Sequence, residues 1–220
     1  MPGSATRRPC PSWRTAAAVL LALALAACGT AAPPPPRVTR APPPPPSAGE
    51  ACQRQLAARG VIFTPMPQAA ALGACTLPDG VRVEGMGAAM NRPVALACPT
   101  AMAVDRWVDE VVQPAARRHL KRQVGVVHHA GGFACRRTRG GNPSEHAKGR
   151  AIDIWGFELD DGSKALVRDH WSGAGARSRF LQDVARRSCA VFHTVLGPSG
   201  DADHHDHLHL DLGAWKLCAP

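Results

Sequence analysis

The sequence predicts an α+β domain, with a mainly antiparallel sheet flanked by helices. Apolar residues recur at helical spacing in residues 101–120 and 180–187. Shorter segments, such as residues 151–157 and 207–212, alternate in the manner of half-buried strands. The chain from about residue 50 to 220 is long enough for one domain with a full hydrophobic core.

The first half of this domain is expected to mix short strands with one long helix. Residues 51–59 suit a short helix that ends at Gly60, and strands are expected at 61–63 and 81–84. The long helix at 101–120 has Thr100 as its candidate N-cap, and Pro114 should kink or divide it because proline cannot donate the helical hydrogen bond.

The second half alternates strands with loops that carry polar residues. A buried strand at 124–127 leads into a Gly-rich polar loop, 131–143. The next strand, 151–157, should end in a hairpin turn at Asp160-Asp161-Gly162. A helix at 180–187 and a strand at 207–212 complete the domain.

The first residues of the chain read as an export signal. Arg7, Arg8 and Arg14 precede an apolar run, 16–27, which at 12 residues is too short for a bilayer that needs about 20. The sequence Leu25-Ala26-Ala27-Cys28 resembles a bacterial lipobox, in which Cys28 would carry the lipid. We therefore expect a signal peptide at 1–27 and a lipid anchor at Cys28; an ordinary signal peptide is the alternative. Gly29 after the cysteine implies sorting to the outer membrane.

Residues 28–49 are expected to be a tether between the lipidated cysteine and the domain. They contain the proline runs 33–36 and 42–46. Such a segment tends toward extended polyproline II, in which about 20 residues reach roughly 60 Å. That length would hold a domain at 50–220 away from a membrane and toward a cell-wall layer.

Six cysteines remain in the expected domain, an even number that indicates three disulfides in an exported protein. The pairing is open among Cys52, Cys75, Cys98, Cys135, Cys189 and Cys218. A cysteine-ligated zinc is the weaker alternative, because the sequence contains no CxxC pair.

The chain is basic, with a formal net charge of +9. Residues 1–27 contribute three arginines and no acid, so the rest keeps about +6. A basic exported domain could bind an anionic wall polymer or lipid. We expect no nucleic-acid partner, because the chain has an export signal and lacks the basic-aromatic pattern of nucleic-acid modules.

Two groups of histidines and acids form the strongest chemical signal. His146 and Asp153 are seven positions apart, and Gly149 between them allows an irregular turn. Residues 204–211 hold four histidines and two aspartates. His207 and His209 would share one face of a strand, so that one could ligate a metal while the other assists. Two histidines and one aspartate with an open position suit a single catalytic zinc ion (Zn2+). A His-rich metal-storage tract is the alternative.

These residues resemble a known group. The pattern Ser144-x-His146-x-x-Gly149-x-Ala151-x-Asp153, followed by Asp206-His207-x-His209, is similar to that of the zinc D-Ala-D-Ala metallopeptidases, which share a superfamily with lysostaphin-type peptidases and the hedgehog signalling domain. The wider context resembles the bacterial extensin-like C-terminal family over nearly the whole domain, through Cys52, Cys98-Pro99, Gln113 to Arg118, Cys135-Arg136 and Leu196-Gly197-Pro198. The resemblance implies a hedgehog/D-Ala-D-Ala-peptidase-like fold.

The resemblance also implies roles for individual residues. The zinc ligands would be His146, Asp153 and His209. Asp206 would be the general base, and His204 and His207 the imidazoles that stabilise the substrate carbonyl. Arg136 would bind substrate or the oxyanion.

Two of these assignments stay open on the residues themselves. On a regular strand Asp206 would point away from His207 and His209, so it can serve as base only if it lies in the turn before the strand. Otherwise His207 or His204 is the better base. Arg137 or Arg139 could take the arginine role.

The expected function is zinc-dependent hydrolysis of amide bonds in the peptide stems or cross-links of peptidoglycan. Metal-acidified water, a nearby base and cationic groups for the oxyanion suffice for this chemistry. Carboxypeptidase and endopeptidase action, and D,D or L,D bonds, remain open. We expect a lipid-anchored periplasmic monomer, whose membrane contact is the anchor alone. The alternative function is a non-catalytic, zinc-containing lipoprotein that binds the cell wall.

Overall fold

The structure is a computed structural model that describes residues 46–66, 75–200 and 202–220. The expected signal peptide, Cys28 and most of the expected tether lie outside these ranges. Within them, no helix combines the length and apolar character needed to cross a membrane.

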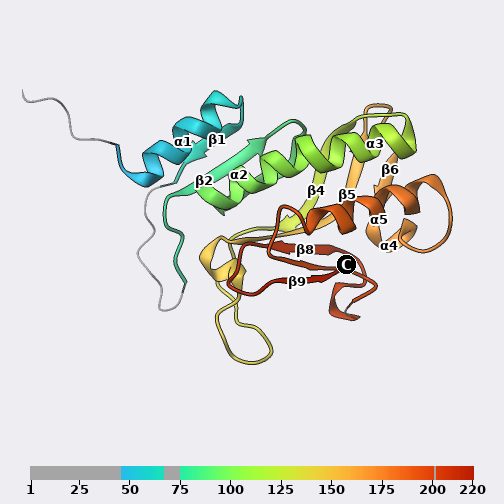
Figure 1. Ribbon diagram of the computed structural model, residues 1–220. Helices are drawn as coiled ribbons and strands as arrows, with labels where there is room; N and C mark the ends of the chain where they lie inside the picture. Colours follow the sequence, from blue (N-terminus) through green and yellow to red (C-terminus); the bar gives the residue numbers. More distant parts are fainter. Residues whose placement is uncertain (1–45, 67–74, 201) are drawn as a thin grey trace, which may run out of the picture. The chain divides into compact units, whose positions relative to one another are not determined.

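Helices and strands follow one another in small groups along the described chain (Figure 1). The helices are α1 (Ala48–Ala58), α2 (Cys98–Trp107), the π-helical turn η1 (Val108–Val112), α3 (Gln113–Leu120), the 3-10 turn η2 (Glu145–Lys148), α4 (Val167–His170), α5 (Ala176–Ser188) and the 3-10 turn η3 (Ala202–His204). The strands are β1 (Ile62–Pro65), β2 (Gly80–Gly85), β3 (Ala89–Ala97), β4 (Val124–Gly131), β5 (Ala151–Leu159), β6 (Lys164–Leu166), β7 (Thr194–Leu196), β8 (Leu208–Asp211) and β9 (Leu217–Ala219).

In the described ranges the strands form one nine-stranded mixed sheet, in the order β1-β2-β3-β4-β5-β8-β7-β9, with β6 paired to β5. Only the β3–β4 and β7–β9 pairs of this sheet are parallel. The predicted α+β class with a mainly antiparallel sheet is therefore confirmed. The likeness to the hedgehog/D-Ala-D-Ala-peptidase fold stays a prediction.

Strand β5 lies at the centre of the fold and separates the core from the opposite face of the sheet. One edge of β5 pairs with β4, while the other pairs first with β8 and then with β6. Ile152 and Ile154 are fully buried in the core, so Asp153 between them points to the other face. Leu208 and Leu210 of β8 are buried in the same way, which places His209 on the face of Asp153.

The core lies between the sheet and helices α2, α3 and α5. Trp107 packs near Phe157 of β5, with ring centroids 6.0 Å apart, and its indole donates a hydrogen bond to Ser188 of α5. Phe157 also meets Phe180 of α5 edge to face, at 5.2 Å. These contacts fix β5, and with it the position of Asp153.

Pro114 modifies the long helix without ending it. Segments α2, η1 and α3 run as one continuous helix (Figure 1), and its π turn ends at Val112, two residues before the proline. The N–H of Gln113 reaches back to the carbonyl of Val108, five residues earlier. The expected N-cap at Thr100 is wrong: the helix begins at Cys98, because Pro99 fits the first turn, where its missing N–H costs nothing.

One long strand and several short ones were not predicted from the sequence. Strand β3 contains Pro93, which normally argues against a strand; here it lies in a stretch where the pairing with β2 is irregular. Strands β6, β7 and β9 have three residues each, too few to show a periodicity.

Three disulfides join the six cysteines of the domain, as expected in number. They are Cys52–Cys98, Cys75–Cys135 and Cys189–Cys218. The first joins α1 to α2. The second fixes the loop between β4 and η2, and the third joins the end of α5 to β9.

Candidate metal centre

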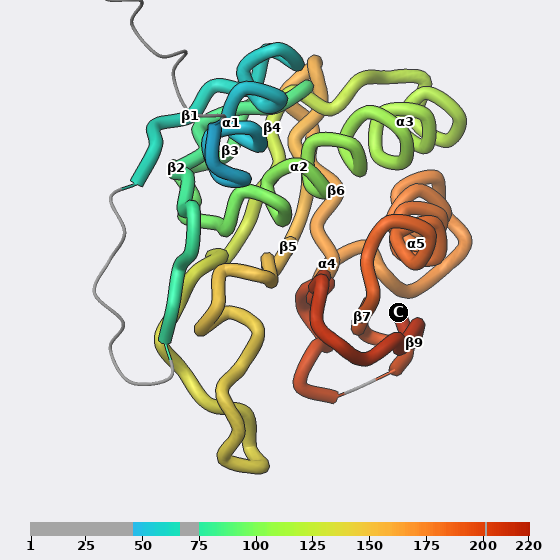
Figure 2. The backbone as a smooth tube through the Cα atoms, turned by 60° about the vertical axis from the view of Figure 1, so that its left-hand side comes forward, coloured from blue at the N-terminus to red at the C-terminus, as the bar shows by residue number. Residues whose placement is uncertain are grey.

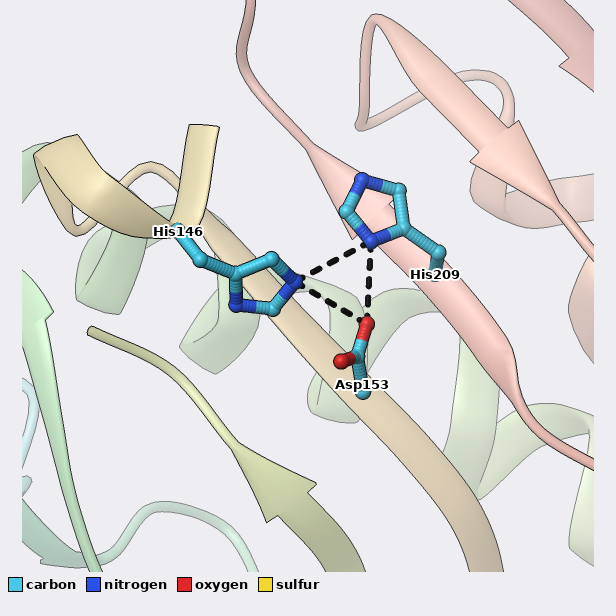
Figure 3. Close-up of side chains that lie close together, drawn as sticks. All are labelled: His146, Asp153 and His209. Atoms are coloured by element: carbon cyan, nitrogen blue, oxygen red, sulfur yellow. Dashed lines mark hydrogen bonds and ion pairs between the residues drawn. The ribbon is translucent and has the colours of Figure 1, made fainter. Parts of the chain in front are cut away.

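Three side chains from distant parts of the sequence converge on the face of the sheet opposite the helices (Figure 3). The Nε2 atom of His146 lies 3.1 Å from Oδ1 of Asp153 and 3.2 Å from Nδ1 of His209. The third side of the triangle, between Asp153 Oδ1 and His209 Nδ1, is 2.9 Å. In the described residues, these three make the group of ligand type that could hold a metal ion.

The sheet and one short turn position the three side chains. Asp153 and His209 are direct partners in the antiparallel pair β5–β8. His146 lies in η2, whose first turn is capped by the hydroxyl of Ser144, which accepts from the N–H of His146. Ser144 thus shapes the turn, as its motif position suggests.

Gly149 closes that turn in a conformation that suits glycine. Its φ is +65°, and a Cβ there would come within 2.2 Å of Leu77 and 2.8 Å of the backbone nitrogen of Ala97. Its carbonyl accepts from the N–H of Ala97. The chain can therefore reverse tightly from His146 into β5.

In each imidazole, the nitrogen that faces away from the cluster donates a hydrogen bond. The second ring nitrogen therefore carries the lone pair and points it into the cluster. Nδ1 of His146 donates to the carbonyl of Gly132 at 2.6 Å, leaving Nε2 to face the cluster. Nε2 of His209 donates to the Asp211 carboxylate at 2.9 Å, leaving Nδ1 to face it. Such a carbonyl or carboxylate behind a histidine is typical of metal sites.

The pKa values of Asp153 and His209 are shifted in the directions that favour a negative carboxylate and a positive imidazolium. Burial disfavours the charged forms of His209 and Asp153, but the hydrogen bonds of these two side chains together shift each pKa further in the opposite direction. The hydrogen bonds to Asp153 and Asp211 raise the pKa of His209 to about 9. Those from His146 and His209 hold the pKa of Asp153 well below its ordinary value.

The three atoms also fit a metal ion in place of a proton. Tetrahedral ligands about 2.0–2.1 Å from zinc lie roughly 3.3 Å from one another. The observed separations of 2.9 to 3.2 Å approach that value. Two imidazole nitrogens and one carboxylate oxygen are also a donor set that zinc accepts.

Arg136 contacts the same cluster from the loop after β4, which projects from the rest of the chain (Figure 2). Its Nη2 donates to Oδ2 of Asp153 at 3.0 Å, while 53% of the side chain stays exposed. The neighbouring Cys135–Cys75 disulfide and the hydrogen bond from Ala134 N–H to the His146 carbonyl hold this part of the loop. Arg137 instead donates to the carbonyl of Gly141, and Arg139 pairs with Asp203.

Asp206 and His207 form a pair beside the cluster. Asp206 lies in the turn before β8, as a base at this position requires. Its Oδ1 accepts from Nδ1 of His207 at 2.8 Å, and the Nε2 of His207 is 3.9 Å from Oδ1 of Asp153. His207 thus stands between Asp206 and the cluster. The ring of His204 lies 5.0 Å from that of His207 and 5.7 Å from that of His209.

The cluster opens into a cleft of about 790 Å³. His204, His207 and His209 line it, whereas Asp206 borders a smaller hollow beside Trp155. The cationic side chains in the cleft wall are Arg136, Arg137, Arg139, Lys148 and Arg150. Glu145 pairs with Lys148 at 3.1 Å and with Arg150 at 2.7 Å, which braces the turn that carries His146.

The structure brings together all seven residues singled out in the sequence, and adds Asp211 and Trp215. His207, His209 and Asp211 are spaced by two, and that alternation could have identified Asp211 as the carboxylate behind His209. No sequence signal identified Trp215. His128 and His129 of β4 lie outside the cluster: Nε2 of His128 is 3.3 Å from the Glu158 carboxylate, and Nε2 of His129 is 2.9 Å from the Arg92 carbonyl.

A comparison with protein families returns one match. The family model described as extensin-like protein C-terminus covers residues 50–219. No curated protein and no solved structure matches the chain.

Proposed function

We propose that this chain, a member of the extensin-like protein C-terminus family, is a zinc-dependent hydrolase of amide bonds in the peptide stems or cross-links of peptidoglycan. The observation that carries the proposal is the convergence of His146 Nε2, Asp153 Oδ1 and His209 Nδ1 within 3.2 Å of one another at a cationic cleft. The relationship to the zinc D-Ala-D-Ala metallopeptidases is part of the proposal.

One zinc ion would be held by His146, Asp153 and His209. Bound there, zinc supplies Lewis acidity, which polarises a substrate carbonyl and acidifies water. Arg136 donates to Oδ2 of Asp153, so Oδ1 is the atom of this carboxylate that would bind the ion. The exposed part of the same guanidinium can bind a carboxylate or a developing oxyanion in the cleft.

His207 is the residue best placed to move a proton. Its Nδ1 donates to Asp206, so a neutral ring carries the Nε2 lone pair toward the cluster. Asp206 would fix this tautomer and stabilise the imidazolium that forms. The geometry thus favours His207 as base and Asp206 as the residue that positions it. His204, whose ring lies near those of His207 and His209, would help to stabilise the negative charge that develops on the substrate carbonyl.

Two features support the proposed substrate class: the charge of the cleft lining and the predicted export signal. The lining holds four arginines and one lysine against three acids, Glu145, Asp203 and Asp211, and this positive excess suits the carboxylates of peptidoglycan stems. The predicted signal peptide at 1–27, lipid anchor at Cys28 and tether to residue 49 would deliver the domain to the periplasm, at the outer membrane and within reach of the wall. A monomer bound to the membrane by the anchor alone is sufficient for this task.

Digestion of purified sacculi by the zinc-loaded full-length chain tests the proposal. Mass spectrometry of the released fragments should show new amide ends, and their masses would distinguish D,D from L,D cleavage and stem trimming from cross-link cleavage. His146→Ala should abolish release. His170→Ala is the matched control, because His170 lines a separate pocket, bonds only the backbone of Leu166 in the described contacts, and does not line the cleft.

Two results would overturn the hydrolase. Equal release by wild type and His146→Ala would disprove the proposed mechanism. Tight binding to sacculi without any released fragment would instead favour the non-catalytic wall-binding lipoprotein.

A further inference from the structure

One large apolar side chain stands exposed in the cleft. Trp215 is 83% exposed, the most of any large hydrophobic residue in the described ranges. It lines the cleft with His207, His209 and Arg136. An exposed indole in a concave site is a common ligand contact, because its flat face is apolar and rigid.

The backbone that carries Trp215 is held on both sides. The carbonyl of Trp215 accepts from the Thr194 hydroxyl at 3.2 Å. Two residues earlier, the carbonyl of Gly213 accepts from His193 Nδ1 at 2.6 Å. Three residues later, Cys218 is joined to Cys189. The indole is thus presented from a fixed loop between β8 and β9.

Asp211 connects this loop to the metal cluster. Its Oδ2 accepts from Nε2 of His209, and its Oδ1 accepts from the N–H of Gly213 at 2.7 Å. The buried Asp211 carboxylate therefore orients the His209 ring and also holds the start of the loop that carries Trp215. The backbone at residue 215 is therefore tied to the cluster through Asp211 and Gly213.

The rest of the cleft decides which ligand suits this indole. Most residues of its wall carry hydroxyl, amide, imidazole or charged groups, among them Thr138, Asn142 and Ser144, and the apolar ones besides Trp215 are Pro143, Leu196 and Ala214. A lipid or an apolar peptide would require a contiguous apolar surface, which the described lining does not provide. A pyranose ring has an apolar face of C–H groups and a polar edge, so it matches one aromatic plate within polar walls.

We propose that Trp215 is the stacking platform for an N-acetylated sugar of the glycan strand, next to the stem peptide at the His146–Asp153–His209 cluster. The inference rests on the proposed function and deepens it: the preferred substrate is a stem still attached to glycan. Trp215 would then act on substrate binding and not on the chemical step.

Sugar binding can be tested without any cleavage. The probe is the tetramer of β-1,4-linked N-acetylglucosamine, which contains no amide bond between amino acids. Titration into the full-length 15N-labelled chain should shift the indole N–H resonance of Trp215, identified by its loss in Trp215→Phe. Trp215→Ala should weaken binding by roughly tenfold, whereas Trp215→Phe should keep most of the affinity.

Ile62→Ala is the control, since Ile62 is 62% exposed on β1 and does not line the cleft. It should bind the tetramer like the wild type. Absence of binding by the wild type, or equal binding by Trp215→Ala, overturns the platform.

A cleavage assay separates this inference from the hydrolase. Trp215→Ala should raise KM for glycan-linked stems more than KM for free stem peptides, and should leave kcat for glycan-linked stems near the wild-type value. Equal KM for glycan-linked stems would contradict the platform. Trp215-dependent sugar binding in a chain that cleaves nothing would support the platform while refuting the hydrolase.

Discussion

Asp153 of β5 and His209 of β8 face each other across an antiparallel strand pair, with Oδ1 of Asp153 2.9 Å from Nδ1 of His209. Their strand neighbours are core residues, so burial of Ile152, Ile154, Leu208 and Leu210 fixes the two polar groups on the other face. A shift of β8 by one residue in this register would turn His209 into the core, away from Asp153. The proposed metal site therefore depends on the packing beneath the sheet.

Asp211→Asn should weaken zinc binding by about 10- to 100-fold. Nε2 of His209 now donates to this carboxylate. An asparagine that turns its amide N–H toward the ring would favour the tautomer with the proton on Nδ1, the atom that should face zinc. Competition with a chromogenic chelator measures the affinity. The matched Asp161→Asn, in the β5–β6 turn, should bind zinc normally; equal losses in both variants would contradict the role of Asp211.

Asp206→Asn and His207→Ala should each lower kcat by about 10²- to 10⁴-fold with zinc still bound. The double variant should be little worse than His207→Ala, because Asp206 would act through the ring that it orients. Muropeptide turnover under saturating substrate measures both effects. If the two losses multiply, Asp206 acts independently of His207, and the assignment of Asp206 itself as the base gains support.

Gly149→Ala should destabilise the domain by more than about 2 kcal/mol. The substitution places a Cβ against Leu77 and Ala97 at a φ of +65°. Urea unfolding measures the loss, and zinc affinity should fall with it because the turn carries His146. Gly140→Ala is the matched control, since only Thr138 lies near its Cβ, at 3.9 Å. Similar stability of the two variants would show that the turn adapts.

Removal of the Cys75–Cys135 disulfide should lower both stability and zinc affinity. The bond closes a loop of 60 residues, which is worth about 4 kcal/mol in the chain-entropy account. It also anchors the loop that places Arg136 on Asp153. The serine pair at Cys52 and Cys98 should lose similar stability and keep zinc affinity. Thermal unfolding and chelator competition measure the two quantities; unaltered zinc affinity in both variants would exclude the anchoring role.

Asp183 should add acid-labile stability to the packing of α3 on α5. Burial disfavours its charged form, yet hydrogen bonds from His119 and Arg187 hold its pKa below the ordinary value. A lowered folded pKa gives stabilisation that is complete above the unfolded pKa, near 3.8, and is lost as the pH falls through the folded pKa.

The variant Asp183→Asn should therefore be less stable than the wild type by about 1 kcal/mol at pH 7. The difference should shrink as the pH approaches 3, which urea unfolding at several pH values can follow. Asp169→Asn, an exposed pair with Arg168, should show no such trend. A constant difference for Asp183→Asn would show that its charge is not the cause.

The long or strongly patterned elements were predictable because their periodicity is local. The helix at 101–120 and the strand at 151–157 both appear, since each buries a continuous apolar face. The exceptions also have local causes. Pro99 moved the helix start to Cys98, and Pro93 concealed β3. Three-residue strands such as β7 exist only because a longer neighbour supplies their partner.

The sequence by itself determined the α+β class, the number of disulfides and the residues of the proposed site. Those properties follow from periodicity, composition and short-range spacing. Only the tertiary structure decided the disulfide pairing, the place of Asp211 behind His209, the position of His207 between Asp206 and the cluster, and the presence of Trp215 in the cleft. These relationships join residues that strand register and core packing bring together, and no local pattern encodes which distant atoms will meet.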